Sequence, residues 1–268
     1  MALIIESKHL KIMRAVLVES AMVEFSLKKE VFGRFLEEVG ASFDMFAPIA
    51  GDPAKGAQES HFAQVRSADD IRPLQANTFF PAKYFFFDRE ETLFSFKDGK
   101  VLPAEISMQR RLFFGLRQCD LNGILHQDKV FLSDPVDPYY KARRDASLLI
   151  GLHCKEGDRW CFCNSIGLKE FFDLMFHDKG DIYGVRVGTD KGRAFIEEFR
   201  QYFDQHNEPI VTDEDKETIN HFQLNHLAIK DLYHRAEWEQ LSDRCTSCGA
   251  CNNLCPNCHC FGVHDKVE

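Results

Sequence analysis

Hydrophobic positions recur at helical spacing in the first clear element of the chain. In the stretch SLKKEVFGRFLEEVGA, apolar side chains repeat with charged residues between them, and Gly40 follows as a helix stop. The pattern predicts an amphipathic helix that packs its apolar stripe on a sheet. The residues of that stripe are Leu27, Val31, Phe35, Leu36 and Val39.

Three later stretches are aromatic or aliphatic and predict strands. FFPAKYFFFDREETLFSF and ISMQRRLFFGLR are rich in β-prone residues, and ASLLIGLHC is a short apolar run typical of a strand buried on both faces. Between the last two lies CDLNGILHQDKVF, in which Asp120 can cap a short helix after a strand that ends at Arg117. The order strand, helix, strand predicts an α/β layer, with α+β as the alternative.

The next two stretches predict a hairpin and a helix. FDLMFHDKGDIYGVRVG has turn residues at 178–181 between two apolar runs, which predicts a β-hairpin. TDKGRAFIEEFRQYFDQH begins with a threonine, a preferred helix cap, and spaces three phenylalanines one helical turn apart. They are Phe195, Phe199 and Phe203.

These elements divide the chain into three parts. Residues 1–205 form the α/β domain. Residues 206–240 are polar and poor in glycine and proline, and we expect a mostly helical bridge that carries the following segment away from the α/β body. Residues 241–268 form a small ferredoxin-like iron–sulfur segment.

Composition narrows the class of protein. Hydrophobic residues make up 44% of the 268 residues and charged residues 28%, which are ordinary values for a globular protein. A net charge of −9 disfavours nucleic acid as a partner. No stretch approaches the roughly 18 apolar residues of a membrane span, and the first residues lack the order of a signal peptide. We therefore expect a cytoplasmic protein. Its 25 phenylalanines should fill a core or a subunit interface.

The stretch RCTSCGACNNLCPNCHC holds six of the ten cysteines. Its first four have the spacing C-x2-C-x2-C-x3-C followed by proline, which is the bacterial ferredoxin spacing and predicts a 4Fe–4S cluster. Small residues between them let backbone amides approach the sulfurs. Zinc is the alternative, although zinc sites usually show two separated C-x2-C pairs. The predicted ligands are Cys245, Cys248, Cys251 and Cys255.

The fourth cysteine of this spacing usually serves a second cluster, which needs another such run. The sequence holds no second run of this kind. Either Cys258 or Cys260 completes a single cluster, or the chain is part of a longer protein or relies on a partner chain. We expect a truncated chain or a two-cluster arrangement that is completed elsewhere.

A second group of cysteines lies in the α/β domain. Cys119 and Cys154 each follow a predicted strand, and Cys161 and Cys163 lie shortly after the second of these. Because the ends of parallel strands converge on one crevice, all four can meet there. Each alone could be an ordinary buried thiol. Together, and with nearby arginines to lower their pKa values, they predict a second metal or cluster site.

Other candidate residues have a simpler interpretation beside the functional one. His153 and His259 adjoin cysteines and could tune a cluster, or be ordinary histidines. Arg143 and Arg144 could contact an anionic cofactor, or form salt bridges. The sequence contains no G-x-G-x-x-G, Walker loop, nucleophile elbow or zinc-protease helix, so no familiar fingerprint for a flavin or nicotinamide is present.

Five motifs in order carry a resemblance to a known family. FFFDREETLFSF, FFGLRQCDLNGI, DPYYKARRDASLLIGLHC, CFCNSIG and CTSCGACNNLCPNCHCF together resemble the beta subunit of cytoplasmic sulfhydrogenases and the related A subunit of anaerobic sulfite reductase. The resemblance implies an electron-transfer subunit with two ferredoxin-type 4Fe–4S clusters. It implies partners in a hetero-oligomer: a flavin- and NAD(P)-binding subunit and a catalytic metalloenzyme subunit. The chain departs from the family in lacking its second C-terminal cysteine run.

We therefore expect an iron–sulfur electron-transfer subunit of a cytoplasmic oxidoreductase, of hydrogenase or sulfite-reductase type, with no catalytic side chains of its own. One cluster should lie at the C-terminal cysteines and a second at the N-terminal ones. Two alternatives remain. One is a zinc-stabilised interaction module, and the other is an enzyme whose N-terminal cluster keeps an open coordination position for a small substrate.

Overall fold

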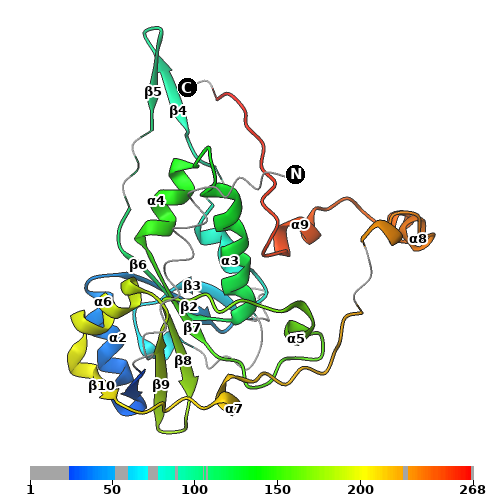
Figure 1. The fold of residues 1–268 in the computed structure, drawn as a ribbon. Helices are drawn as coiled ribbons and strands as arrows, with labels where there is room; N and C mark the ends of the chain where they lie inside the picture. The colour runs from blue at the N-terminus through cyan, green and yellow to red at the C-terminus, as the bar shows by residue number, and fades with distance from the viewer. Residues whose placement is uncertain are drawn as a thin grey trace, which may run out of the picture.

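A mixed eight-stranded sheet forms the body of the molecule (Figure 1). The computed structural model describes residues 24–51, 60–71, 78–87, 90–104, 106, 108–225 and 229–266. Within them the strand order is β10-β1-β9-β8-β7-β6-β2-β3, with β2, β6, β7 and β8 parallel and antiparallel strands on either side. The strands are β1 (Glu24–Lys28), β2 (Asp44–Ile49), β3 (His61–Gln64), β6 (Arg111–Leu116), β7 (Ser147–Leu152), β8 (Leu174–Asp178), β9 (Ile182–Val187) and β10 (Phe203–His206).

Helices cover both faces of this sheet. α2 (Phe32–Gly40) and α6 (Asp190–Glu198) share an apolar core on one face, and α3 (Gln118–Phe131) and α4 (Pro138–Ala146) share a second core on the other (Figure 1). The predicted α/β class is therefore confirmed. Short 3-10 helices join these elements: η1 (Lys29–Val31), η3 (Ala68–Asp70), η4 (Ala82–Phe85) and η5 (Arg200–Tyr202).

Burial on both faces explains why the central strands are continuous apolar runs. In β7, Leu148 and Ile150 lie in the core with α2 and α6, whereas Leu149 lies in the core with α3. This alternation follows from the two-residue period of a strand. Many of the phenylalanines are buried in the same two cores, as their surplus predicted.

The first helix begins later than the periodicity predicted. Leu27 belongs to β1 rather than to the helix, and it pairs with Tyr183 on β9 and with Phe203 on β10. Its side chain is fully buried, which contributes about 1.5–3 kcal/mol. A strand bonded on both sides outweighs the helical spacing, because the sheet satisfies its backbone groups and buries the same apolar side chain.

The predicted hairpin and the cap of the next helix are confirmed. β8 and β9 pair antiparallel around the turn at residues 179–181. The Thr189 side chain accepts a hydrogen bond from the backbone N–H of Gly192 and caps α6. The helix ends before Phe199, and Phe203 begins β10, so the third phenylalanine of the series lies in a strand.

The described residues of the aromatic stretch before residue 94 do not form a strand. They form η4 after Pro81, and Phe86 and Phe87 pack toward the core with α3 and α4. The strand of this region is β4 (Phe94–Lys97), which pairs only with β5 (Lys100–Pro103) among the described residues. This hairpin projects from the body, and all of its strand residues are exposed (Figure 1).

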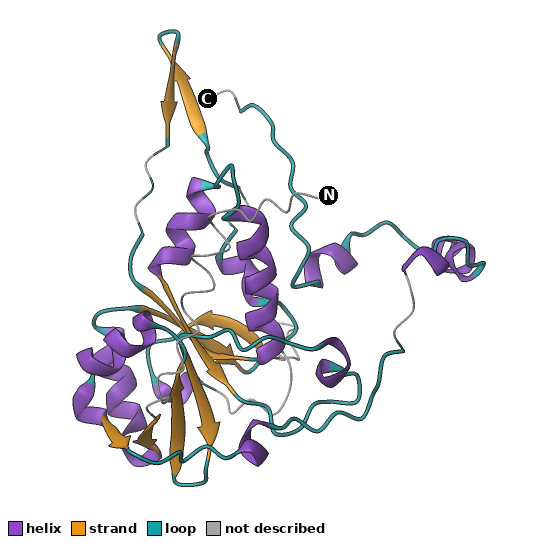
Figure 2. Cartoon of the chain, viewed as in Figure 1, coloured by secondary structure: helices purple, strands orange, loops and turns teal. Residues whose placement is uncertain are grey.

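Among its described residues, the segment that follows the sheet is helical only over short stretches. The helices described there are α7 (Asp213–Lys216), η6 (Ile229–Asp231), α8 (Glu237–Asp243) and, within the terminal cysteine run, α9 (Ala250–Leu254) (Figure 2). These residues lack a continuous apolar stripe that would hold a longer helix against a core. In the described part of the chain, no helix is both long enough and apolar enough to cross a bilayer.

Candidate functional site

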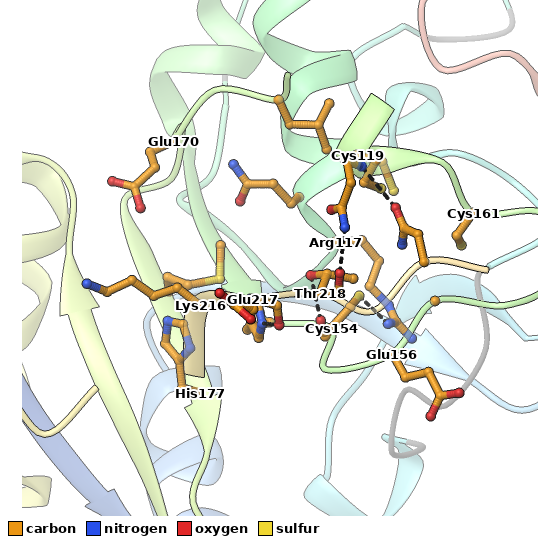
Figure 3. A pocket seen from close by; sticks show the side chains of 18 of the residues that line it. Arg117, Cys119, Cys154, Glu156, Cys161, Glu170, His177, Lys216, Glu217 and Thr218 are labelled. Atoms are coloured by element: carbon orange, nitrogen blue, oxygen red, sulfur yellow. Dashed lines mark hydrogen bonds between the residues drawn. The ribbon is translucent and has the colours of Figure 1, made fainter. Parts of the chain in front are cut away.

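The four N-terminal cysteines line one cavity of about 580 Å³ at the carboxyl ends of β6 and β7 (Figure 3). Cys119 lies in the first turn of α3, and Cys154 lies just after β7. Cys161 lies in the loop that follows, and Cys163 begins the short helix α5 (Cys163–Ile166). The structure thus brings together the four residues that the sequence predicted would meet.

Arg117 places a positive charge in this cavity. Its guanidinium is buried, with 7% of the residue exposed, and its Nη1 donates a hydrogen bond to the Cys154 sulfur. Burial nevertheless raises the pKa of Cys154, against the effect of Arg117. A hydrogen bond between Cys119 and Cys163, which also line the cavity, raises the pKa of the first thiol and lowers that of the second. Cys163 is therefore the better thiolate of the pair.

The start of α3 fixes the positions of Arg117 and Cys119. Asp120 accepts a hydrogen bond from the Arg117 backbone N–H at 3.1 Å, which closes the first turn of the helix. This is the capping role predicted for Asp120, although it acts from within the first turn and not from the position before the helix. Burial raises the pKa of its carboxyl group.

Residues 216–220 form a wall of the cavity that sequence reasoning missed (Figure 3). Thr218 Oγ1 donates to the Cys154 carbonyl oxygen at 2.7 Å, and the Gly157 N–H donates to the Ile219 carbonyl oxygen at 2.9 Å. Asn220 Oδ1 accepts from the backbone N–H next to Cys163, that of Asn164, at 2.9 Å. The wall therefore fastens the loop that carries three of the four cysteines.

A pair of histidines lies on the opposite side of the cavity from Cys119. The rings of His153 and His177 stack with centroids 4.9 Å apart, and each donates to a carbonyl oxygen of the 215–217 segment at 3.0 Å. Burial, together with the neighbouring imidazole, lowers the pKa of His177 to about 4. Both rings are therefore neutral at pH 7. Of these two, the sequence singled out only His153, through its place beside Cys154.

The terminal cysteine run has a different environment. Cys245, Cys248 and Cys251 are exposed. The residues between them include Ser247 and Gly249 with φ of 53° and 73°, left-handed conformations that turn the backbone around a small volume. The Ser247 N–H approaches the Cys245 sulfur at 3.4 Å, and the Ala250 N–H lowers the pKa of Cys248. Backbone amides that face sulfur atoms are the surroundings that iron–sulfur ligands use.

The second half of the run lies against the α/β body. Cys255 and Cys258 are half-buried and hydrogen-bonded to each other through their sulfurs. Gln127 of α3 donates to the Pro256 carbonyl oxygen at 3.0 Å. A Cβ on Gly123 would lie 2.9 Å from the Cβ of Pro256, so the absence of a side chain lets the segment approach α3. Cys260 is exposed.

Thiolates are ligands that both an iron–sulfur cluster and a zinc ion accept. In the described ranges, no three His, Cys, Asp or Glu side chains converge closely enough to hold one metal ion. Thiolates with amide or guanidinium donors nearby are the ligands that an iron–sulfur cluster takes.

The two arginines of the α4 motif do not line the cavity. Arg143 pairs with Glu91, and Arg144 pairs with Asp128 at 3.1 Å. Tyr140 also donates to Asp128, at 2.7 Å. Of the two interpretations of these arginines, the salt bridges are the one that the contacts support.

Comparison with known proteins gives one informative similarity. No protein-family model matches the chain, and no solved structure matches it. Among curated proteins, the chain is 31% identical over 253 residues to the protein named Sulfhydrogenase 2 subunit beta from Pyrococcus furiosus. The alignment covers 88% of this chain and 71% of that relative. At this identity and coverage, the two chains share a common ancestor and one fold.

Proposed function

The chain belongs to the family of sulfhydrogenase beta subunits, and on that premise we propose that it is an iron–sulfur electron-transfer subunit of a multi-subunit oxidoreductase. Such a subunit has no need of nucleophilic or acid–base side chains. Its task is to hold clusters and to set their potentials through burial, hydrogen bonds to sulfur and nearby charge.

The observation that carries this proposal is the terminal cysteine run. Its first four cysteines have ferredoxin spacing, and Cys245, Cys248 and Cys251 are exposed. A cluster held by them would lie at the molecular surface, where a partner subunit can bring its own redox centre close. Cys255, which Pro256 follows, is half-buried, unlike these three. Cys258 and Cys260 are the further candidate ligands.

A second cluster at Cys119, Cys154, Cys161 and Cys163 would extend the relay into the α/β body. The guanidinium of Arg117 would stabilise the negative charge of the thiolates and of the added electron. Iron–sulfur clusters span roughly −700 to +450 mV, and a nearby positive charge shifts the potential of a cluster to a more positive value.

The proposed partner subunits are inferred from the family and not from the geometry of the cysteine sites. We propose a cytoplasmic hetero-oligomer in which one partner binds flavin and oxidises a pyridine nucleotide, and another partner carries the catalytic metal centre. That catalytic partner is of hydrogenase or sulfite-reductase type. The exposed rings of Phe94 and Phe96 on β4 are suited to such an interface.

Iron and acid-labile sulfide per chain, measured on protein purified without oxygen, test the proposal together with electron paramagnetic resonance after dithionite reduction. About eight irons with two interacting reduced clusters are expected from one cluster at each cysteine group. About four irons would leave the N-terminal cysteines as plain thiols. Zinc without iron would overturn the proposal in favour of a zinc-stabilised interaction module.

A second candidate function is favoured by the size of the cavity. At about 580 Å³ it has room for more than four thiols, and it also contains Arg117, His177 and Arg186. An N-terminal cluster with one open coordination position could therefore act on a small substrate. Turnover by the isolated chain, and an iron with only three cysteine ligands, would distinguish this enzyme from a relay subunit.

A further inference from the structure

Lys83 of η4 contacts the terminal cysteine run, although at least 169 positions separate the contacting residues in the sequence. Only 8% of the residue is exposed. Its Nζ donates to three backbone carbonyl oxygens, those of Asn252 at 2.9 Å, Cys255 at 2.6 Å and Cys258 at 2.8 Å. An ammonium group has three N–H donors, so the segment from Asn252 to Cys258 satisfies all of them.

The acceptors lie at and beyond the C-terminal end of α9. The last carbonyl groups of a helix have no partner within it, and a cation is favourable there because of the helix dipole. Tyr84, next to Lys83, donates through its hydroxyl to the Asn253 carbonyl oxygen at 2.9 Å. η4 therefore supplies hydrogen-bond donors to the carbonyl groups at this end of α9. Through the same contacts it holds Cys255 and Cys258, which follow α9.

The charge of Lys83 has no carboxylate partner among the described residues. A buried cation is costly unless an anion lies near it. The anionic groups that face Lys83 are the thiols of Cys255, Cys258 and Cys260, which raise the pKa of Lys83 against the larger lowering effect of burial. The structure thus encloses a positive charge for which the described residues offer thiols, and no carboxylate, as the balancing anions.

We propose that Lys83 is a positioning residue of the terminal metal site: it seats the segment from Asn252 to Cys258 on the α/β body, and its charge raises the reduction potential of the cluster held there. The second half rests on the proposed function, whereas the seating does not. On reduction one electron enters the site and its charge becomes more negative by one. The ammonium stabilises that state and transfers no proton.

Alkylation of the metal-free full-length chain by iodoacetamide tests the seating, with mass-spectrometric mapping of each cysteine. In Lys83→Met, Cys255 and Cys258 should react about tenfold faster, while the already exposed Cys245 keeps its rate. If the substitution removed only the charge, the alkylation of Cys255 and Cys258 would become slower, because a nearby cation favours the reactive thiolate. Rates that are unchanged or slower in the variant would therefore overturn the seating.

Lys129→Met is the matched control for these experiments. Lys129 lies on the exposed side of α3, so the same substitution removes one positive charge from the surface without touching the terminal segment. Its cysteine reactivities should equal those of the unmodified chain. A thermal unfolding midpoint close to that of the unmodified chain establishes that each variant is folded. If Lys83→Met does not fold, Lys83→Gln takes its place.

The reduction potential of the iron-loaded chain tests the role of the charge. Lys83→Met should shift the reduction equilibrium about tenfold toward the oxidised state, which corresponds to about 59 mV for one electron. Lys83→Arg, which keeps the charge, should restore the potential, and Lys129→Met should leave it unchanged. An equal potential in Lys83→Met and the unmodified chain would overturn this role. Absence of iron from the unmodified chain would instead refute the proposed function and leave the alkylation result standing.

Discussion

Gly157 controls how closely the loop carrying Cys161 can fold over the cavity. A Cβ at this position would lie 2.5 Å from the Cβ of Cys161 and 3.0 Å from Nδ2 of Asn220. The first contact is with an atom next to the backbone, so the loop itself must move. The φ angle of Gly157 is open to other residues, so Gly157→Ala adds no backbone strain and its cost comes from the clash.

Overpacking of this kind costs about 1–3 kcal/mol. In a chain of this size each kcal/mol lowers Tm by about 2–4 °C, so thermal unfolding should show the cost directly. Because the displaced atoms belong to a proposed cluster ligand, iron should also fall from about eight to about four per chain. The remaining iron should give the spectrum of a terminal cluster without its interacting partner.

Gly262→Ala provides the control for this prediction. A Cβ at Gly262 would meet nothing within 4 Å, so its Tm and iron content should match the unmodified chain. Full iron content together with an unchanged Tm in Gly157→Ala would refute the reasoning. Lower Tm with full iron would show that the loop moves but that Cys161 is not a ligand.

Three further predictions follow from contacts described above or from the buried first strand. Cys248→Ser and Cys154→Ser should each remove about four irons per chain, and loss of all iron in either single variant would contradict two independent sites. The fold lowers the pKa of His177 to about 4, so below pH 6.5 the unfolded chain binds a proton at this residue and the folded chain does not. The free energy of unfolding should therefore be constant above pH 6.5 and fall by up to about 3 kcal/mol as the pH is lowered to 4. Urea unfolding of His177→Phe should lack this part of the pH dependence, and an unaltered profile would refute the assignment. Glu24, buried on β1, accepts from the N–H of Ile210 and Val211, and Glu24→Ala should lower the free energy of unfolding by about 1–3 kcal/mol per orphaned donor in urea titrations.

The sequence could predict the meeting of Cys119 and Cys154, because both follow strands and the strands are parallel. It could also predict the turn between β8 and β9 and the Thr189 cap, since these depend on neighbouring residues. Such features are local, or follow from one rule of sheet geometry. They can therefore be predicted from a single sequence.

The contacts of Lys83 could not be predicted in this way. In FFPAKYFFF it is an ordinary lysine among aromatic residues, and its partners lie 169 to 175 positions away. Residues 216–220 are similarly polar and featureless in the sequence. Leu27 was misassigned for the same reason, because its strand exists only through pairing with β9 and β10, which come much later in the chain.

The wall at residues 216–220 also has a consequence for biosynthesis. The ribosome makes the four N-terminal cysteines first, yet the segment that encloses them emerges more than fifty residues after Cys163. The partners of Lys83, from Asn252 to Cys258, emerge later still. Before residues 216–220 are made, the cavity lacks the wall that they form. Before residues 252–258 are made, Lys83 and Tyr84 of η4 lack their hydrogen-bond acceptors. Iron delivered early would meet an open, solvent-facing set of thiols. The N-terminal site reaches its final form only when synthesis has passed residue 220, and the seat of the terminal run on Lys83 only when it has passed residue 258.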